Sequence, residues 1–137
     1  MQEFIWPVRV YYEDTDSGGV VYYANYLKFM ERARTEWLRS LKLEQDTLAR
    51  EHKVLFVVRS VSIDYRRPAR FNDLLQVRSR LEEVRGASLV FGQEIVKTAN
   101  SDKLLCHGRI MVACVNADTF KPRSVPRMIL MEIFGDS

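Results

Sequence analysis

The chain has 137 residues and a mass of 16.1 kDa, which suits one domain over residues 1–137 and leaves little room for a second. Hydrophobic residues make up 47% and charged residues 28%, the balance of a soluble globular protein. The net charge of +3 suits an anionic ligand but is too small an excess for a dedicated nucleic-acid binder. No apolar stretch is long enough for a transmembrane segment, and none follows a cationic start as in a signal peptide. We therefore expect a cytoplasmic protein, free or attached peripherally to the inner membrane.

The two cysteines, Cys106 and Cys114, fall in one predicted strand. Eight residues of strand separate their Cα atoms by roughly 27 Å, whereas a disulfide needs them within about 7 Å. A disulfide within the chain is therefore not expected, which fits a reducing cytoplasm. With no CxxC pair and only two histidines, His52 and His107, we expect no zinc site.

The first half of the chain predicts a strand, a turn and a long helix. Pro7–Tyr12 is rich in β-forming residues, and Glu13–Gly19 follows as a turn of acids and glycines. Apolar residues then recur every three or four positions over Asn25–Leu41, which predicts a helix with Asn25 as its N-cap. A second, shorter helix is expected around Gln45–Glu51.

The second half of the chain predicts four strands joined by short connections, such as the turn Asn100–Asp102. Short connections favour antiparallel neighbours, so we expect a meander. Together with the first strand, these strands predict an α+β fold in which one curled five-stranded antiparallel sheet wraps around one long helix. The four predicted strands are Val54–Tyr65, Leu74–Val84, Ala87–Lys97 and Leu104–Val115.

The run Ile110–Val115 is apolar on both of its faces. A helix covers at most one face of a sheet, so this run predicts a second subunit on the other face. The alternative is a strand buried on both faces within a single chain. We favour the oligomer.

Several catalytic motifs are absent from the sequence, namely GxSxG, GxGxxG and GxxxxGK[ST]. What remains is carboxylate chemistry in the turn Glu13–Gly19, just before the long helix. A carboxylate there can act as general base or nucleophile, and free N–H groups at the helix start can hold an oxyanion. The residues alone favour a polar turn in which Asp14 and Asp16 bind local N–H groups. An Asp-x-Asp metal site ranks below both.

The run VRVYYEDTDSGGVVYYANYLKFMERARTEWLR, Val8–Arg39, closely resembles the hot-dog-fold acyl-CoA thioesterases. It is most similar to the YbgC branch of the 4-hydroxybenzoyl-CoA thioesterase family, whose signature is D-x-D-x-x-G-x-V-[YWF]. The likeness continues through Phe56–Val58, Arg85–Phe91 and Phe120–Arg123 and so spans nearly the whole chain.

This resemblance implies hydrolysis of an acyl-CoA or acyl-carrier-protein thioester without a metal or bound cofactor. It gives Asp16 the role of nucleophile or general base, and the Tyr23 backbone N–H the role of oxyanion donor. It also implies a homodimer, or a homotetramer built as a dimer of dimers, with each active site shared between two subunits. Many members of the branch have His at the position of Tyr23, and a phenol with a pKa of about 10 cannot replace imidazole as a base.

Substrate contacts are expected from both the turn and the basic side chains. Gly19, Val20 and Tyr26 are candidates near the thioester. Cationic partners for the CoA phosphates are expected at Arg59, Arg85, Lys121 and Arg123, and the cluster Arg66–Arg70 is a further candidate. The alternatives to a thioesterase are a hot-dog enzyme of other chemistry, such as a hydratase, and a non-catalytic module that binds an acyl carrier.

Overall fold

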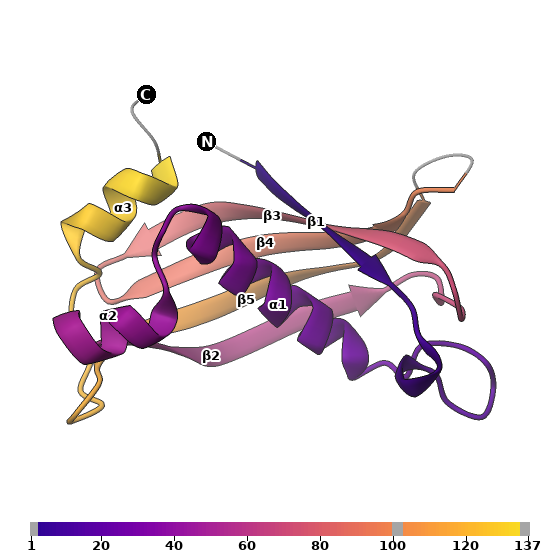
Figure 1. Cartoon of the computed structure of the whole chain (residues 1–137), viewed down its shortest axis with the longest axis horizontal. Helices are drawn as coiled ribbons and strands as arrows, with labels where there is room; N and C mark the ends of the chain where they lie inside the picture. The colour runs from indigo at the N-terminus through magenta and orange to yellow at the C-terminus, as the bar shows by residue number, and fades with distance from the viewer. Residues whose placement is uncertain (1–2, 100–102, 135–137) are drawn as a thin grey trace.

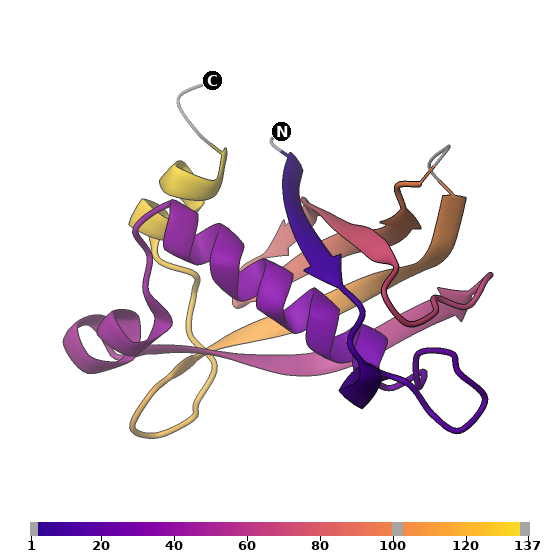
Figure 2. The same ribbon diagram turned by 45° about the vertical axis from the view of Figure 1, so that its right-hand side comes forward.

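The computed structural model describes residues 3–99 and 103–134, so the predicted turn Asn100–Asp102 lies outside the described residues. The described part is a curled five-stranded sheet with a long helix across one face (Figures 1 and 2). Its elements are β1 (Glu3–Arg9), a 3-10 turn (Tyr12–Asp14), α1 (Asn25–Ser40), α2 (Gln45–His52), β2 (Val54–Tyr65), β3 (Leu74–Arg85), β4 (Ser88–Lys97), β5 (Lys103–Asn116) and α3 (Arg127–Phe134).

The strands are ordered β1-β3-β4-β5-β2, and each paired strand is antiparallel to its neighbour. This confirms the predicted α+β sheet around one helix. The predicted meander holds for β3, β4 and β5 but is wrong for β2, which pairs with β5 and not with β3. The connection 66–73 is longer than a hairpin loop and carries the chain from the β2 edge to β3, next to β1. As a result, β2 is an edge strand.

Helix α1 packs its apolar stripe against the concave face of the sheet. Phe29, Met30, Ala33 and Trp37 are buried in this contact, at the three- and four-residue spacing that predicted the helix. The prediction that Asn25 is the N-cap is wrong. Asn25 is the first helical residue, and its Nδ2 donates to the Asp14 carbonyl at 2.9 Å because the turn folds back onto the helix start.

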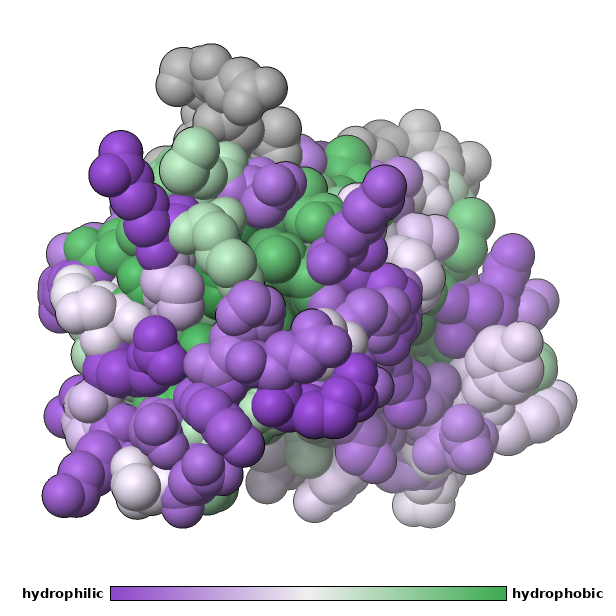
Figure 3. All heavy atoms as spheres, turned by 60° about the vertical axis from the view of Figure 1, so that its left-hand side comes forward, coloured by the Kyte–Doolittle hydropathy of each residue, from purple (hydrophilic) through white to green (hydrophobic). Residues whose placement is uncertain are grey.

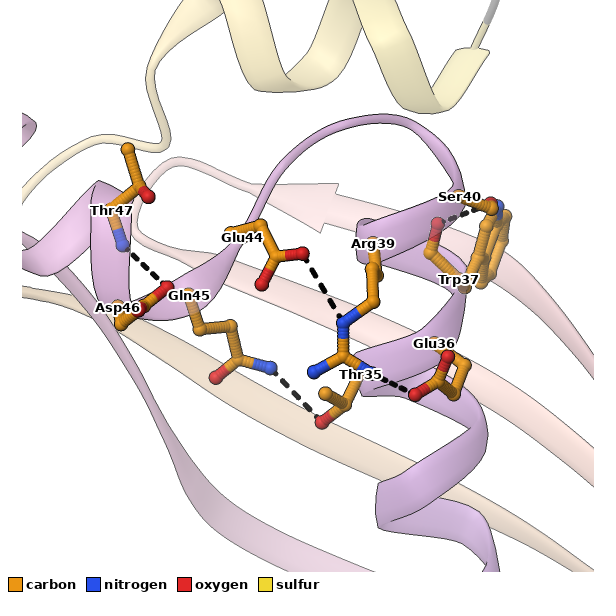
Figure 4. Close-up of polar contacts among 9 residues, drawn as sticks. All are labelled: Thr35, Glu36, Trp37, Arg39, Ser40, Glu44, Gln45, Asp46 and Thr47. Atoms are coloured by element: carbon orange, nitrogen blue, oxygen red, sulfur yellow. Dashed lines mark hydrogen bonds and ion pairs between the residues drawn. The ribbon is translucent and has the colours of Figure 1, made fainter.

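The end of α1 is joined to α2 by polar contacts (Figure 4). Gln45 Nε2 donates to Thr35 Oγ1 at 3.1 Å, and Arg39 pairs with both Glu36 and Glu44. These contacts hold α2 beside the start of β2, and they confirm the predicted short helix. From the side on which α2 and α3 lie, hydrophilic side chains cover the lower part of the face and a hydrophobic area lies in its upper part (Figure 3).

Two elements differ from the predicted boundaries. The first strand was predicted at Pro7–Tyr12, but it begins at Glu3 and ends at Arg9, because Phe4, Trp6 and Val8 pack against the core on alternate positions. Helix α3 was not predicted. It buries Ile129 and Ile133, one turn apart, within an eight-residue segment.

Strand β5 carries both cysteines and the run Ile110–Val115. Cys106 and Cys114 are buried free thiols, as expected from their separation along one strand. Four residues of the apolar run are already buried within one chain, namely Ile110, Val112, Cys114 and Val115. A strand buried within a single chain therefore accounts for most of this run. No helix within residues 3–99 and 103–134 is long and apolar enough to span a bilayer.

Candidate active site

The acid- and glycine-rich turn forms a small hairpin between the 3-10 turn and α1. The Asp16 N–H donates to the Val20 carbonyl at 2.9 Å, and the Tyr22 N–H donates to the Asp14 carbonyl at 2.9 Å. Gly19 closes the hairpin with a φ of 80°, a left-handed conformation that glycine adopts without steric cost. The hairpin therefore places Asp16 on one leg, and the other leg leads directly into Tyr23. We call residues 14–23 the acidic hairpin.

The acidic hairpin is fixed to the connection that follows β2. Val21 donates its N–H to the Ala69 carbonyl at 2.8 Å, and Ala69 in turn donates its N–H to the Tyr26 hydroxyl at 2.9 Å. Val20 also forms an isolated bridge with Arg70. Since Ala69 is fully buried, these bonds tie the hairpin, the start of α1 and the connection 66–73 into one unit.

The two aspartates of the hairpin have different surroundings. One carboxylate oxygen of Asp14 accepts the Tyr11 N–H at 2.8 Å, so Asp14 stabilises the 3-10 turn, as the polar-turn alternative expects. Asp16 is exposed, and its Oδ1 accepts the Gly18 N–H at 2.9 Å. Among the described residues, no ion pair includes Asp16 and no hydrogen bond takes its Oδ2. Asp16 thus offers a carboxylate oxygen that is free for chemistry.

Free backbone donors lie where the hairpin enters α1. Within residues 3–99 and 103–134, the N–H groups of Tyr23 and Ala24 have no hydrogen-bond acceptor. They belong to the positive end of the helix, where unpaired N–H groups favour negative charge. The Tyr65 hydroxyl donates to the Tyr23 carbonyl at 3.3 Å, and the two rings meet edge to face, which orients this peptide. These donors have the chemistry that an oxyanion needs.

The tyrosine hydroxyls around the hairpin stay protonated. Burial raises the pKa of Tyr26 and of Tyr65, and a hydrogen bond with Tyr23 raises the pKa of Tyr22. None of these three phenols can therefore act as a base near neutral pH. This leaves the carboxylates of Asp14 and Asp16 as the basic groups of the acidic hairpin, and Asp16 is the exposed one of the two.

The residues predicted to contact the substrate lie at different places in the fold. Gly19 and Val20 lie in the hairpin, whereas Tyr26 is buried and uses its hydroxyl to hold Ala69. Arg59 lies at a bulge in the middle of β2. Lys121 and Arg123 lie near the start of β2, far from the hairpin, whereas Arg85 lies beside the middle of β2, where it lines a hollow with Ser60 and Ser62.

The distance between Arg123 and the hairpin follows from β2. Arg123 Nη1 donates to the His52 carbonyl, just before β2 begins, and Tyr65, at the end of β2, contacts Tyr23. Twelve residues of strand span roughly 35 Å. Within one chain, Arg123 is therefore remote from Asp16. Arg85 lies beside the middle of β2 and pairs with Glu83 at 2.6 Å. Figure 1 shows the hairpin at the lower right and the loop after β5 at the lower left.

A groove runs between α1 and the β2–β5 edge of the sheet; we call it the α1–β2 groove. It has one hollow of about 440 Å³ toward the start of α1 and another of about 250 Å³ toward its end. Sequence reasoning missed this groove, because its walls come from segments about 30 residues apart. Its apolar lining includes Leu27, Leu38, Phe56, Val58, Val61, Phe91 and Ile110.

No group of histidine, cysteine or acidic side chains within the described ranges is arranged to hold a metal ion. His107 contacts Asp64 at 3.4 Å, and His52 lies at the end of α2, so neither histidine joins the acidic hairpin. The acidic hairpin, its free donors and the groove are the features that carry chemistry.

Comparisons with known proteins agree with this architecture. Residues 10–133 match the model of the thioesterase-like superfamily. The acyl-CoA thioester hydrolase YbgC of Escherichia coli O6:H1 is 49% identical over 129 residues, which cover 94% of each chain. The probable thioesterase of Bartonella henselae is 35% identical with a TM-score of 0.84, over 91% of this chain and 100% of that one. A 1,4-dihydroxy-2-naphthoyl-CoA thioesterase from Synechocystis, 24% identical, shares the fold with a TM-score of 0.90 over 98% of each chain.

The curled sheet, its central helix and these matches define a hot-dog-fold thioesterase, that is, a thioester hydrolase. The chain belongs to the thioesterase-like superfamily and, within it, to the YbgC branch of acyl-CoA thioesterases.

Proposed function

We propose that the whole chain acts as one thioesterase domain, in which Asp16 performs the hydrolysis of an acyl-CoA and the Tyr23 N–H stabilises the oxyanion. The observation that carries this proposal is the pairing of a free carboxylate oxygen with unpaired backbone donors on the two legs of one hairpin. The free Oδ2 of Asp16 supplies the base or nucleophile, and the N–H groups of Tyr23 and Ala24 supply the donors.

Two routes balance with these groups. As a general base, Asp16 takes a proton from water, hydroxide adds to the thioester carbonyl, and the C–S bond breaks as the carboxyl returns the proton to the leaving thiolate. As a nucleophile, Asp16 forms a mixed anhydride and expels the thiolate, and water then cleaves the anhydride. In both routes negative charge develops on the carbonyl oxygen, which the Tyr23 N–H binds. The products are a carboxylic acid and free CoA.

We propose that a second copy of the chain completes the site. Strand β2 is a twelve-residue edge with exposed Val58 and Val61, and such an edge favours pairing with another strand. Pairing of two β2 strands about a two-fold axis runs them antiparallel and exchanges their ends. The partner subunit's Arg123 would then approach the hairpin of this subunit, where the CoA phosphates need cations. A homodimer is the smallest assembly with this property, and a pair of dimers has it too.

A further part of the proposal concerns the carrier of the acyl group, which can be CoA or an acyl carrier protein. Arg70 lies beside the acidic hairpin, where it forms a bridge with Val20. Arg66 and Arg67 lie earlier on the same connection 66–73, where Arg66 pairs with Asp64 and Arg67 donates to the Leu104 carbonyl. These cations give an acyl-carrier-protein thioester a place to dock as an alternative to CoA. The buried free thiols of Cys106 and Cys114 support the reducing cytoplasm as the compartment.

The test is thiol release from an acyl-CoA by wild type, Asp16→Asn and Glu13→Gln. Glu13 is an exposed acid in the same segment and serves as the matched control. Removing one oxyanion donor costs about 10²–10³ in rate, and we expect Asp16→Asn to lower kcat/KM at least as much. Glu13→Gln should leave it within about twofold. If Asp16→Asn turns over as fast as wild type, Asp16 is not the catalytic residue.

The same assay separates the two alternatives. A hydratase adds water across an enoyl group and leaves the thioester intact, so it releases no thiol. A non-catalytic module binds the acyl thioester in a saturable way with turnover no faster than a blank. Either result with the wild-type protein would replace the proposal.

A further inference from the structure

The two hollows of the α1–β2 groove are compartments of one channel. Glu31, Arg34 and Val58 line both of them, so these residues form the boundary between the compartments. The first compartment starts at Leu27, one turn after the free N–H groups at the start of α1. A thioester whose carbonyl oxygen is bound there would extend its acyl chain into the first compartment and toward the boundary.

Arg34 is fixed at this boundary by the sheet. Its Nη1 donates to Gln93 Oε1 at 2.8 Å, and Gln93 is only 1% exposed. Gln93 is itself held in place because its Nε2 donates to the Met30 carbonyl at 3.0 Å and to Ser79 Oγ at 2.8 Å. Moving the guanidinium away from the groove therefore breaks its half-buried hydrogen bond with Gln93.

The guanidinium at the boundary is a partly buried cation whose hydrogen-bond partner is neutral. Burial lowers the pKa of Arg34 and the charge of nearby Glu31 raises it, but arginine stays protonated in proteins. Within residues 3–99 and 103–134, no carboxylate lies within ion-pair distance of Arg34. Gln93 takes one of the five guanidinium N–H donors, which leaves donors at the boundary of the two compartments.

Such a group stops a saturated chain. Each methylene buried against an apolar wall strengthens binding about fourfold. A methylene placed against the guanidinium gains nothing of that kind, because it must displace water from a cation. The apolar gain should therefore accumulate along the first compartment and cease at Arg34.

We propose that Arg34 is the residue that limits the length of the acyl chain, with the first compartment as the acyl site and the second closed to saturated chains. This inference rests on the proposed function, because it requires the thioester carbonyl to lie at the start of α1. The Ala24 N–H, where the carbonyl oxygen would be bound, and Arg34 are ten residues and therefore about 15 Å apart along the helix axis. That is the reach of an extended chain of about twelve carbons, because each C–C bond of about 1.5 Å advances a staggered chain by only about 1.3 Å.

The experiment measures kcat/KM for saturated acyl-CoAs from butyryl to octadecanoyl with wild type, Arg34→Met, Arg34→Gln and Arg39→Met. In wild type, kcat/KM should rise with chain length to about dodecanoyl and then level or fall. Arg34→Met should raise the ratio of kcat/KM for hexadecanoyl-CoA to that for octanoyl-CoA at least tenfold. Arg34→Gln also removes the charge while keeping an amide donor for Gln93, and it should move the ratio in the same direction. Arg39, on the same helix, lines neither compartment, so Arg39→Met should keep the wild-type ratio.

A ratio of two substrates within one variant does not depend on how much of that variant is folded. If both Arg34 variants keep the wild-type ratio, Arg34 does not limit chain length. A wild-type kcat/KM that rises steadily through octadecanoyl-CoA would overturn the proposal as well. The proposal would also fail if the Arg34 variants changed their oligomeric state and kept the wild-type ratio of kcat/KM, because a second subunit would then fill the groove. In each of these cases, loss of activity in Asp16→Asn would show that the proposed catalytic function still stands.

Discussion

The Tyr26 hydroxyl holds the acidic hairpin in place, and its removal has a predictable cost. Tyr26→Phe deletes one oxygen and leaves the ring in the core. The Ala69 N–H, which donates to that oxygen at 2.9 Å, then has no partner in a fully buried position. An unsatisfied buried donor costs about 1–3 kcal/mol of unfolding free energy. For a chain of this size, that lowers Tm by about 3–10 °C.

The variant should also lose activity, because the Ala69 carbonyl binds Val21 in the same hairpin. We expect kcat/KM to fall by several-fold, which is less than the loss in Asp16→Asn. Urea unfolding gives the free energy, and thiol release gives the activity. Tyr12→Phe is the matched control, because Tyr12 is 74% exposed and its ring stacks on Phe71 without using the hydroxyl. If Tyr26→Phe changes stability by less than about 0.5 kcal/mol, Tyr26 does not anchor this segment.

Three more predictions test other parts of the account. Val61→Arg on the β2 edge should shift the protein to monomer in light scattering, while Ile5→Arg on the β1 edge, where Ile5 is similarly exposed, should keep the assembly. A monomeric wild type would contradict this. Gly19→Ala should cost about 1–2 kcal/mol in urea unfolding because φ is positive there, and an unchanged midpoint would show that the hairpin relaxes freely. Burial raises the pKa of Cys106 to about 12, so at pH 8 its thiolate fraction should be about a thousandfold below that of an ordinary thiol. The rate at which a thiol reagent labels Cys106 should therefore still increase above pH 9. Rapid labelling of Cys106 in the native protein at pH 8 would contradict this.

The central helix was predictable because local periodicity determines it. The spacing of Phe29, Met30, Ala33 and Trp37 identifies one buried face, and α1 ends one residue before the predicted end. The neighbour of β2 was not predictable in this way. Pairing of β2 with β5 joins residues about 50 positions apart, for example Val57 with Ala113, and no turn sequence specifies it. Helix α3 was missed because eight residues with two buried positions carry little periodic signal.

The site was predictable to the extent that it is local. The acids, the glycines and the helix start are contiguous, so Asp16 and Tyr23 were candidates from the sequence and its family resemblance. The sequence could not show that Asp14 is half-buried and binds the Tyr11 N–H, while Asp16 is exposed and binds the Gly18 N–H. Nor could it show that Arg123 lies at the opposite end of β2, or that Arg34 meets Gln93 across 59 positions. These are consequences of tertiary packing.

One measurement addresses the role of Asp16 most directly, namely kcat and the acyl-CoA dissociation constant of Asp16→Asn side by side. The substitution keeps the size of the side chain and its acceptor for the Gly18 N–H, but it removes the charge. The account predicts that kcat falls at least a hundredfold while the dissociation constant, obtained by calorimetry, stays within about threefold. An undiminished kcat, or a loss explained wholly by weaker binding, would contradict it.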